Sequence, residues 1–175
     1  YKYLERFLDT TKANLFFAKG VIMVEGWSEE ILIPALARKM KKDGLITKDL
    51  TEAGVSIVNV ASAEFRKFAK IFLRKDNHYL NLPVAIITDV DVPAYEKTLR
   101  LDHEGKPEKS GSNNVYEYLK NDKDNVAAQS LIKKKSIEED FNNQFTCVFV
   151  TEQWTLEYSL LVSNSLGDNV KTVLN

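Results

Sequence analysis

Five acidic residues are spaced so that they could take part in one reaction. Glu25 ends the apolar run VIMVE, and Glu29 follows four positions later. Asp89 and Asp91 form a D-x-D pair where the apolar run PVAIIT ends, and Glu157 lies in the later segment WTLEYSLL. Carboxylates that are crowded together repel one another, so such a cluster requires either raised pKa values or bound cations.

A divalent metal ion is the cation that this set of ligands favours. Ligands that offer only oxygen suit Mg²⁺ or Mn²⁺, whereas zinc would call for histidine or cysteine. Two ions about 3.5–4 Å apart would promote in-line displacement at phosphorus. We expect Gly26 to permit a tight turn, so that Glu25 and Glu29 point into the same space.

Each acidic residue also has a purely structural explanation. The helix macrodipole alone favours Glu29 in a first helical turn, where Ser28 would be the N-cap. Aspartates that follow strands often cap helices or form turns, and Glu157 fits the solvated side of a helix. The combination of E-G-x-x-E with D-x-D about 60 residues later is what favours the metal site.

Short apolar runs and amphipathic segments alternate along the chain, which predicts an α/β fold with a central, mostly parallel sheet of about four strands flanked by helices. In such a sheet the carboxyl ends of the strands meet at one edge, where ligands bind. The acidic residues would therefore converge there. The predicted strands are 21–25, 55–60, 83–89 and 145–150, and the predicted helices are 28–42 and 62–75.

The other segments have weaker patterns. Residues 92–113 are polar, contain glycine and proline, and predict a long loop excursion, after which 114–140 read as helical. Pro34 predicts that the first helix starts late or is kinked. We expect all 175 residues to form a single domain.

Composition excludes several classes of protein. The net charge of −1 argues against binding to nucleic acid through bulk charge, although basic residues at 67, 70 and 74 could contact phosphates. The single cysteine, Cys147, is expected to be a buried thiol in a cytoplasmic protein. No apolar stretch approaches the roughly 18 residues of a membrane span, and there is no P-loop motif. The chain lacks an initial methionine, so we expect it to be a piece of a longer protein.

The Glu25-Gly26 turn and the Asp89-Val90-Asp91 segment resemble the hallmarks of a Toprim domain, the Rossmann-like metal-binding module of topoisomerases, primases and several nucleases. The flanking segments LFFAKG and TLEY narrow the likeness to the OLD (overcoming lysogenization defect) family of ATP-dependent endonucleases, which includes the nuclease of Gabija-type antiphage systems. The resemblance extends from about residue 1 to about residue 163.

This resemblance implies a DNA endonuclease that uses Mg²⁺ or Mn²⁺, with two ions. Glu25, Glu29, Asp89 and Asp91 would carry the metals, and Glu157 would complete a second site. One ion would activate water and the other would stabilise the leaving 3′ oxygen. The family also uses a lysine beyond the TLE segment, which is either Lys171 or a residue outside this chain. Possible DNA contacts are Lys67, Lys70, Arg74 and Lys171.

The resemblance also implies partners: DNA, an ABC-type ATPase domain upstream in the same parent chain, and a homo-oligomer formed through the parent protein in a bacterial or archaeal cytoplasm. Two alternatives stay open. One is a primase-type or topoisomerase-type Toprim domain. The other is a non-catalytic domain that binds nucleic acid and metal and has a regulatory role.

Overall fold

The computed structural model of the 175-residue chain describes residues 17–60, 65–74 and 78–163. These residues form two compact units. The first unit contains the described residues up to Thr88 together with Ser136–Val150, and the second contains Asp89–Lys135 and the described residues that follow Val150.

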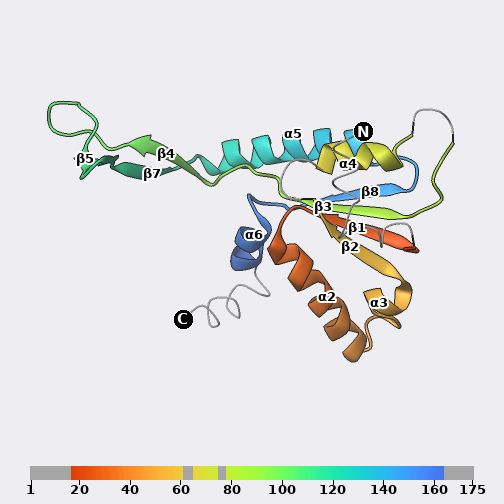
Figure 1. The fold of residues 1–175 in the computed structure, drawn as a ribbon. Coiled ribbons are helices and arrows are strands. Elements are labelled where there is room, and N and C mark those ends of the chain that lie inside the picture. The colour runs from red at the N-terminus through yellow and green to blue at the C-terminus, as the bar shows by residue number, and fades with distance from the viewer. Residues whose placement is uncertain (1–16, 61–64, 75–77, 164–175) are drawn as a thin grey trace. The chain divides into compact units, whose positions relative to one another are not determined.

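The first unit is built on a four-stranded parallel sheet, shown in Figure 1, with the strand order β2-β1-β3-β8. Each strand lies within one residue of its predicted bounds, which confirms the α/β fold with a parallel sheet of four strands. Their core residues include Val24 and Ile86, both fully buried. The strands are β1 (Gly20–Val24), β2 (Val55–Asn59), β3 (Val84–Thr88) and β8 (Thr146–Val150).

Helices connect the first three strands through crossovers that run in opposite directions. The chain moves outward from β1 to β2 through α2 (Trp27–Lys42) and the short α3 (Leu50–Ala53). It then returns across β1 to β3 through α4 (Phe65–Phe72). Right-handed crossovers that run in opposite directions place their helices on opposite faces of a sheet, and Figure 1 shows α2 and α4 on opposite faces. A ligand site is expected where the two directions diverge, at the carboxyl ends of β1 and β3.

The start of α2 corrects two predictions. The N-cap is Gly26, in an extended conformation and without a side-chain cap, so the prediction of Ser28 as the cap is wrong. The helix begins at Trp27 and continues past Pro34, so it does not start late. Gly26 has φ −131°, which any residue can adopt, and its role is therefore not to permit a turn.

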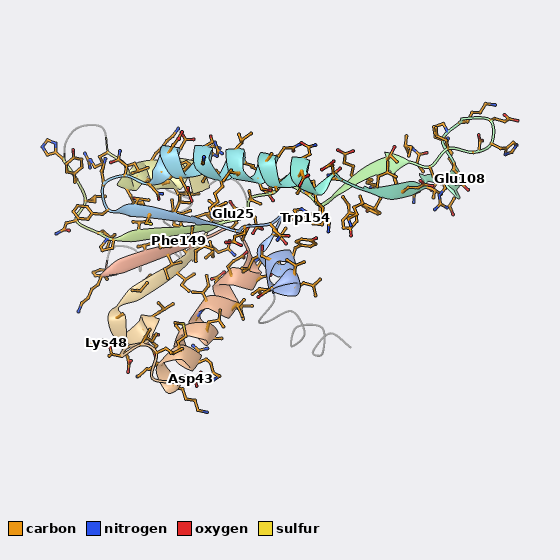
Figure 2. The ribbon with its side chains drawn as sticks, turned by 180° about the vertical axis from the view of Figure 1, so that it is seen from behind. Glu25, Asp43, Lys48, Glu108, Phe149 and Trp154 are labelled. Carbon is orange, nitrogen blue, oxygen red and sulfur yellow. The ribbon has the colours of Figure 1, made fainter. Side chains whose placement is uncertain are left out.

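Strand β8 lies at an edge of the sheet and is buried on one face only. Its exposed positions include Cys147 and Phe149, which is labelled in Figure 2 and is 56% exposed. The prediction that Cys147 is buried is therefore wrong. An apolar run does not reveal which of its faces a helix will cover.

The second unit contains an antiparallel ribbon where an irregular loop was predicted over residues 92–113. Strand β4 (Tyr95–Leu99) pairs with β7 (Tyr116–Lys120), and the small hairpin of β5 (Lys109–Ser110) and β6 (Asn113–Asn114) lies between them in sequence (Figure 1). Most of the ribbon is exposed on both faces, so its strands lack the apolar alternation that would have predicted them.

Two helices complete the described chain. Helix α5 (Lys123–Phe141) contributes residues to both units, and it begins later than the helical segment predicted from residue 114 because residues 116–120 form β7. Helix α6 (Leu156–Val162) belongs to the second unit. None of the helices in the described ranges is both long enough and apolar enough to cross a membrane.

Candidate metal centre

Glu25 is held at the carboxyl end of β1 by a threonine from the neighbouring strand. The parallel register pairs Val24 with Ile87, so the next residues, Glu25 and Thr88, lie side by side. The hydroxyl of Thr88 donates a 2.5 Å hydrogen bond to Glu25 Oε1. Thr88 is only 3% exposed, whereas Glu25 is half-buried. One carboxylate oxygen is thereby oriented at the expected ligand-binding edge of the sheet, where Figure 2 labels Glu25.

Glu29 is buried in the first turn of α2 and folds back over Gly26. It is 6% exposed, and its Oε2 atom has no hydrogen-bond partner among the described residues. A Cβ atom on Gly26 would lie 2.7 Å from that same oxygen. An alanine at this position would therefore displace the carboxylate. A buried carboxylate oxygen without a partner is unfavourable, and a bound cation would compensate it.

Glu30, the next residue, has a different environment. Its Oε2 atom accepts a 3.1 Å hydrogen bond from Asn59 Nδ2 at the end of β2. Two adjacent glutamates at the start of α2 thus differ, because Glu30 has a protein partner and Glu29 Oε2 has none among the described residues. The donor set at this edge fits a hard cation through Glu25 and Glu29, and Glu30 serves a structural contact.

In the second unit, the Asp89-Val90-Asp91 segment is held against the start of α6. Asp89 Oδ1 accepts a 2.8 Å hydrogen bond from the backbone N–H of Leu156, the first residue of α6. The N–H of Val90 donates to Thr151 Oγ1 at 2.9 Å, and the N–H of Asp91 donates to the carbonyl of Trp154 at 2.8 Å. These bonds fix the position of Asp89 at the N-terminus of α6.

Glu157 is an exposed residue in the first turn of α6, directly after the residue that bonds Asp89. The helix is capped by Thr155, whose side chain accepts from the N–H of Tyr158. The structure therefore brings Asp89 and Glu157 to the same helix terminus, although the residues are 68 positions apart in the sequence.

Asp91 differs from Asp89 in exposure and in charge partner. Its side chain is 62% exposed, its backbone has a positive φ of 51°, and Lys133 Nζ lies 3.9 Å from Oδ2. Lys133 Nζ also donates to the Asp91 carbonyl at 3.5 Å. A cation from α5 thus already approaches one of the predicted metal ligands.

The five predicted ligands are divided between the units. Glu25 and Glu29 lie in the first unit, and Asp89, Asp91 and Glu157 lie in the second. Within the described chain, no three histidine, cysteine, aspartate or glutamate side chains are gathered as a ready metal site. The complete ligand set therefore stays a prediction.

The predicted DNA contacts in the described part of the chain are exposed basic residues. Lys67 and Lys70 lie on the exposed side of α4, and Arg74 follows the helix and is exposed. Lys171 lies outside the described residues. These positions stay predictions.

Sequence reasoning missed three residues that contact the acidic residues or the backbone between them: Thr88, Thr151 and Lys133. A threonine at a strand end or in a loop is too common to suggest a role. Lys133 is 42 positions from Asp91 and lies in a helix with charges of both signs, so only the folded chain relates them.

Comparison with known proteins supports the assignment of this segment. Residues 16–91 match the family described as overcoming lysogenization defect protein-like, TOPRIM domain. This range contains the turn at Glu25 and the D-x-D pair. A search of the curated proteins found no match.

Two solved structures resemble the chain. The C-terminal region of the OLD protein of Xanthomonas campestris pv. campestris is 23% identical, with a TM-score of 0.43 over 86% of this chain, which spans 58% of the Xanthomonas chain. The C-terminal region of the Burkholderia pseudomallei OLD protein is 19% identical, with a TM-score of 0.42 over 90% of this chain and 73% of the other. What the comparisons show is thus a match of residues 16–91 to the OLD-like TOPRIM domain family.

Proposed function

We propose that this chain is a divalent-metal-dependent DNA endonuclease domain that hydrolyses phosphodiester bonds. The observation that carries the proposal is the buried Glu29 carboxylate, whose Oε2 atom has no partner among the described residues and lies over Gly26 in the E-G-x-x-E motif. The motif falls inside the TOPRIM match, and domains of that family are associated with metal-dependent nuclease activity.

The proposed ligands are Glu25, Glu29, Asp89, Asp91 and Glu157. Two bound Mg²⁺ or Mn²⁺ ions would supply an activated water and would neutralise charge on the leaving oxygen. An all-carboxylate set suits these hard ions.

The chain's own contribution is to orient the carboxylates before metal and substrate arrive. Thr88 fixes one oxygen of Glu25, and the N–H of Leu156 fixes Oδ1 of Asp89. Partners that orient metal ligands typically change affinity or activity by about 10- to 100-fold when they are removed. We therefore assign positioning roles to Thr88 and to the start of α6.

Nicking of supercoiled plasmid in Mn²⁺ tests the proposal. Glu29→Gln and Asp89→Asn should abolish nicking, because each replaces a proposed charged ligand with a neutral side chain of the same shape. Glu30→Gln is the matched control, since it removes one charge at the adjacent position, whose carboxylate bonds Asn59. It should retain nicking.

Metal binding separates the possible outcomes. If the unaltered chain binds Mn²⁺ in calorimetry but does not nick, the non-catalytic alternative replaces the nuclease proposal. If Glu29→Gln and Glu30→Gln have the same effect on Mn²⁺ affinity, the ligand assignment is wrong. An ATPase domain in the parent chain and assembly through that protein stay predictions from the resemblance.

A further inference from the structure

The ribbon of β4 and β7 has one face that combines aromatic and basic side chains. Directly paired residues of an antiparallel ladder point to the same face, and every second pair shares it. The pairs Tyr95–Lys120, Lys97–Tyr118 and Leu99–Tyr116 therefore lie on one face, which we call the tyrosine–lysine face. A cation–π contact supports this arrangement, because Lys97 Nζ lies 3.9 Å from the centre of the Tyr116 ring.

The opposite face of the same ribbon has a different chemistry. It carries the pairs Glu96–Leu119 and Thr98–Glu117. Glu117 is bonded to Arg100, whose Nε lies 2.9 Å from Glu117 Oε1. Both carboxylates of these two strands thus lie on this second face, while both of their lysines lie on the first. The segregation gives the tyrosine–lysine face a positive charge within a chain whose net charge is −1.

The tyrosines of this face are exposed to solvent. Tyr118 is 69% exposed, and Tyr95 and Tyr116 are each 42% exposed. Exposed aromatic rings beside lysines are typical of surfaces on which unpaired bases stack while cations hold the backbone phosphates. Stacking needs the flat face of a base, and a base in an intact duplex is already stacked on both sides.

The face continues into a cleft of the second unit. Tyr95 and Lys120 also line a cavity of about 670 Å³, together with Lys123 and Lys134 of α5. Among the described residues that line the cavity, Glu152 is the single acidic one. Tyr158 of α6 lies in the same wall, one residue beyond the proposed metal ligand Glu157. A strand bound along the ribbon would thus reach the helix that carries a proposed ligand.

We propose that the tyrosine–lysine face and this cleft bind single-stranded DNA, with unpaired bases stacked on Tyr118 and Tyr95 and phosphates held by Lys97 and Lys120. The proposal rests on the nuclease function proposed above, because it identifies the form of the substrate that the second unit holds. It assigns the ribbon to substrate binding and assigns no chemistry to it.

Fluorescence anisotropy of a labelled oligothymidylate of about 15 nucleotides tests the proposal, in EDTA so that metal chemistry is excluded. The chain should bind this strand more tightly than a duplex of equal length. Tyr118→Ala should weaken binding by about tenfold, within the range observed for one stacked base. Leu119→Ala is the matched control, because Leu119 is 50% exposed on the opposite face of the same ribbon.

A second variant tests the phosphate contacts independently of the tyrosines. Lys97→Gln with Lys120→Gln should lower the slope of log affinity against log salt by about 1.4, which is about 0.7 for each phosphate contact on a single strand. Lys42→Gln with Lys48→Gln removes the same charge from exposed residues of the first unit and should leave the slope unchanged. Circular dichroism of each variant checks that the fold is retained.

The outcomes separate this proposal from the nuclease function. Tighter binding to duplex, or equal losses from Tyr118→Ala and Leu119→Ala, would overturn the single-strand assignment even if the plasmid is nicked. If the chain binds the oligonucleotide but does not nick the plasmid, and if Tyr118→Ala weakens oligonucleotide binding, the binding proposal stands and the nuclease proposal fails.

Discussion

Thr88 Oγ1 donates a 2.5 Å hydrogen bond to Glu25 Oε1, and this contact joins the ends of the two central strands at the proposed site. Thr88→Val keeps the shape of the side chain and removes the donor. We expect the free energy of unfolding to fall by about 1.5 kcal/mol, as for hydrogen bonds to charged groups. Affinity for Mn²⁺ should fall by about 10- to 100-fold, because the ligand loses its orienting partner.

Urea denaturation and calorimetry measure these two effects of Thr88→Val. Thr98→Val is the control, since Thr98 is an exposed threonine in β4 and should change neither quantity. An unchanged Mn²⁺ affinity in Thr88→Val would contradict the positioning role of Thr88.

Gly26→Ala is expected to impair metal binding while preserving the fold. The added Cβ would lie 2.7 Å from Glu29 Oε2, at the end of a flexible side chain, and φ of −131° accommodates alanine. The carboxylate should therefore move, lowering Mn²⁺ affinity by about tenfold or more, while stability changes by less than about 1 kcal/mol.

Gly20→Ala is the matched control for this variant, because a Cβ there meets its neighbours at ordinary distances of 3.5 Å or more. Isothermal titration calorimetry would compare the two variants. A large loss of stability in Gly26→Ala with normal affinity would mean that the glycine serves the backbone and not the carboxylate.

Metal should stabilise the folded chain through Glu29. A ligand that binds only the native state adds about 2.7 kcal/mol at a concentration of 100 Kd, which raises the melting temperature. Glu29→Gln should lose most of this increase. Without metal, the variant should be at least as stable as the unaltered chain, because it removes a buried charge. Differential scanning fluorimetry with and without Mn²⁺ measures both effects, and marked destabilisation in EDTA would argue for a structural role.

Lys133 is expected to oppose metal binding at Asp91. Its Nζ lies 3.9 Å from Asp91 Oδ2, and the pair is substantially exposed. Exposed ion pairs contribute about 0–1 kcal/mol, so Lys133→Gln should leave stability nearly unchanged. Mn²⁺ affinity should rise by up to about fivefold, since a competing cation is removed. Lys135→Gln in the same helix is the control, and a fall in affinity for Lys133→Gln would assign the lysine a supporting role.

We expect the Lys41–Glu52 pair to make the stability of the first unit depend on pH, independently of the metal site. The hydrogen bond from Lys41 holds the pKa of Glu52 below its ordinary value, assisted by the backbone N–H of Asp49. The same bond raises the pKa of Lys41. The ionised Glu52 carboxylate contributes to the free energy of unfolding. This contribution is complete above the ordinary pKa of Glu52 and is lost as pH falls through the lowered pKa.

The contribution of the Lys41 ammonium to the free energy of unfolding is complete below the ordinary pKa of Lys41 and is lost as pH rises through the raised pKa. Carboxyl NMR titration of Glu52 should therefore give a midpoint below the ordinary value, and Lys41→Gln should shift that midpoint upward. An unshifted Glu52 in the unaltered chain would contradict the ion pair.

Much of the first unit could be predicted from the sequence. The apolar runs around Met23, Ile57, Ile86 and Val148 became the four parallel strands, because strands of a parallel sheet bury apolar residues against the helices that cover it. The acidic residues that end β1 and β3 were identified for the same reason, since a carboxylate at the end of an apolar run is conspicuous. The ribbon was missed because strands exposed on both faces have no apolar period.

The sequence by itself thus determined the strands, their parallel arrangement and the candidate acids Glu25, Glu29 and Asp89. Buried strands consist largely of apolar residues, so they and the acids that end them can be recognised from residue type alone. Only the tertiary structure decided which groups become partners: the Thr88 hydroxyl with Glu25, the backbone N–H of Leu156 with Asp89, and the Lys133 ammonium with Asp91. It also placed the tyrosines and lysines of the ribbon on one face. These relationships join residues far apart in the chain or depend on strand register, and local sequence patterns do not encode either.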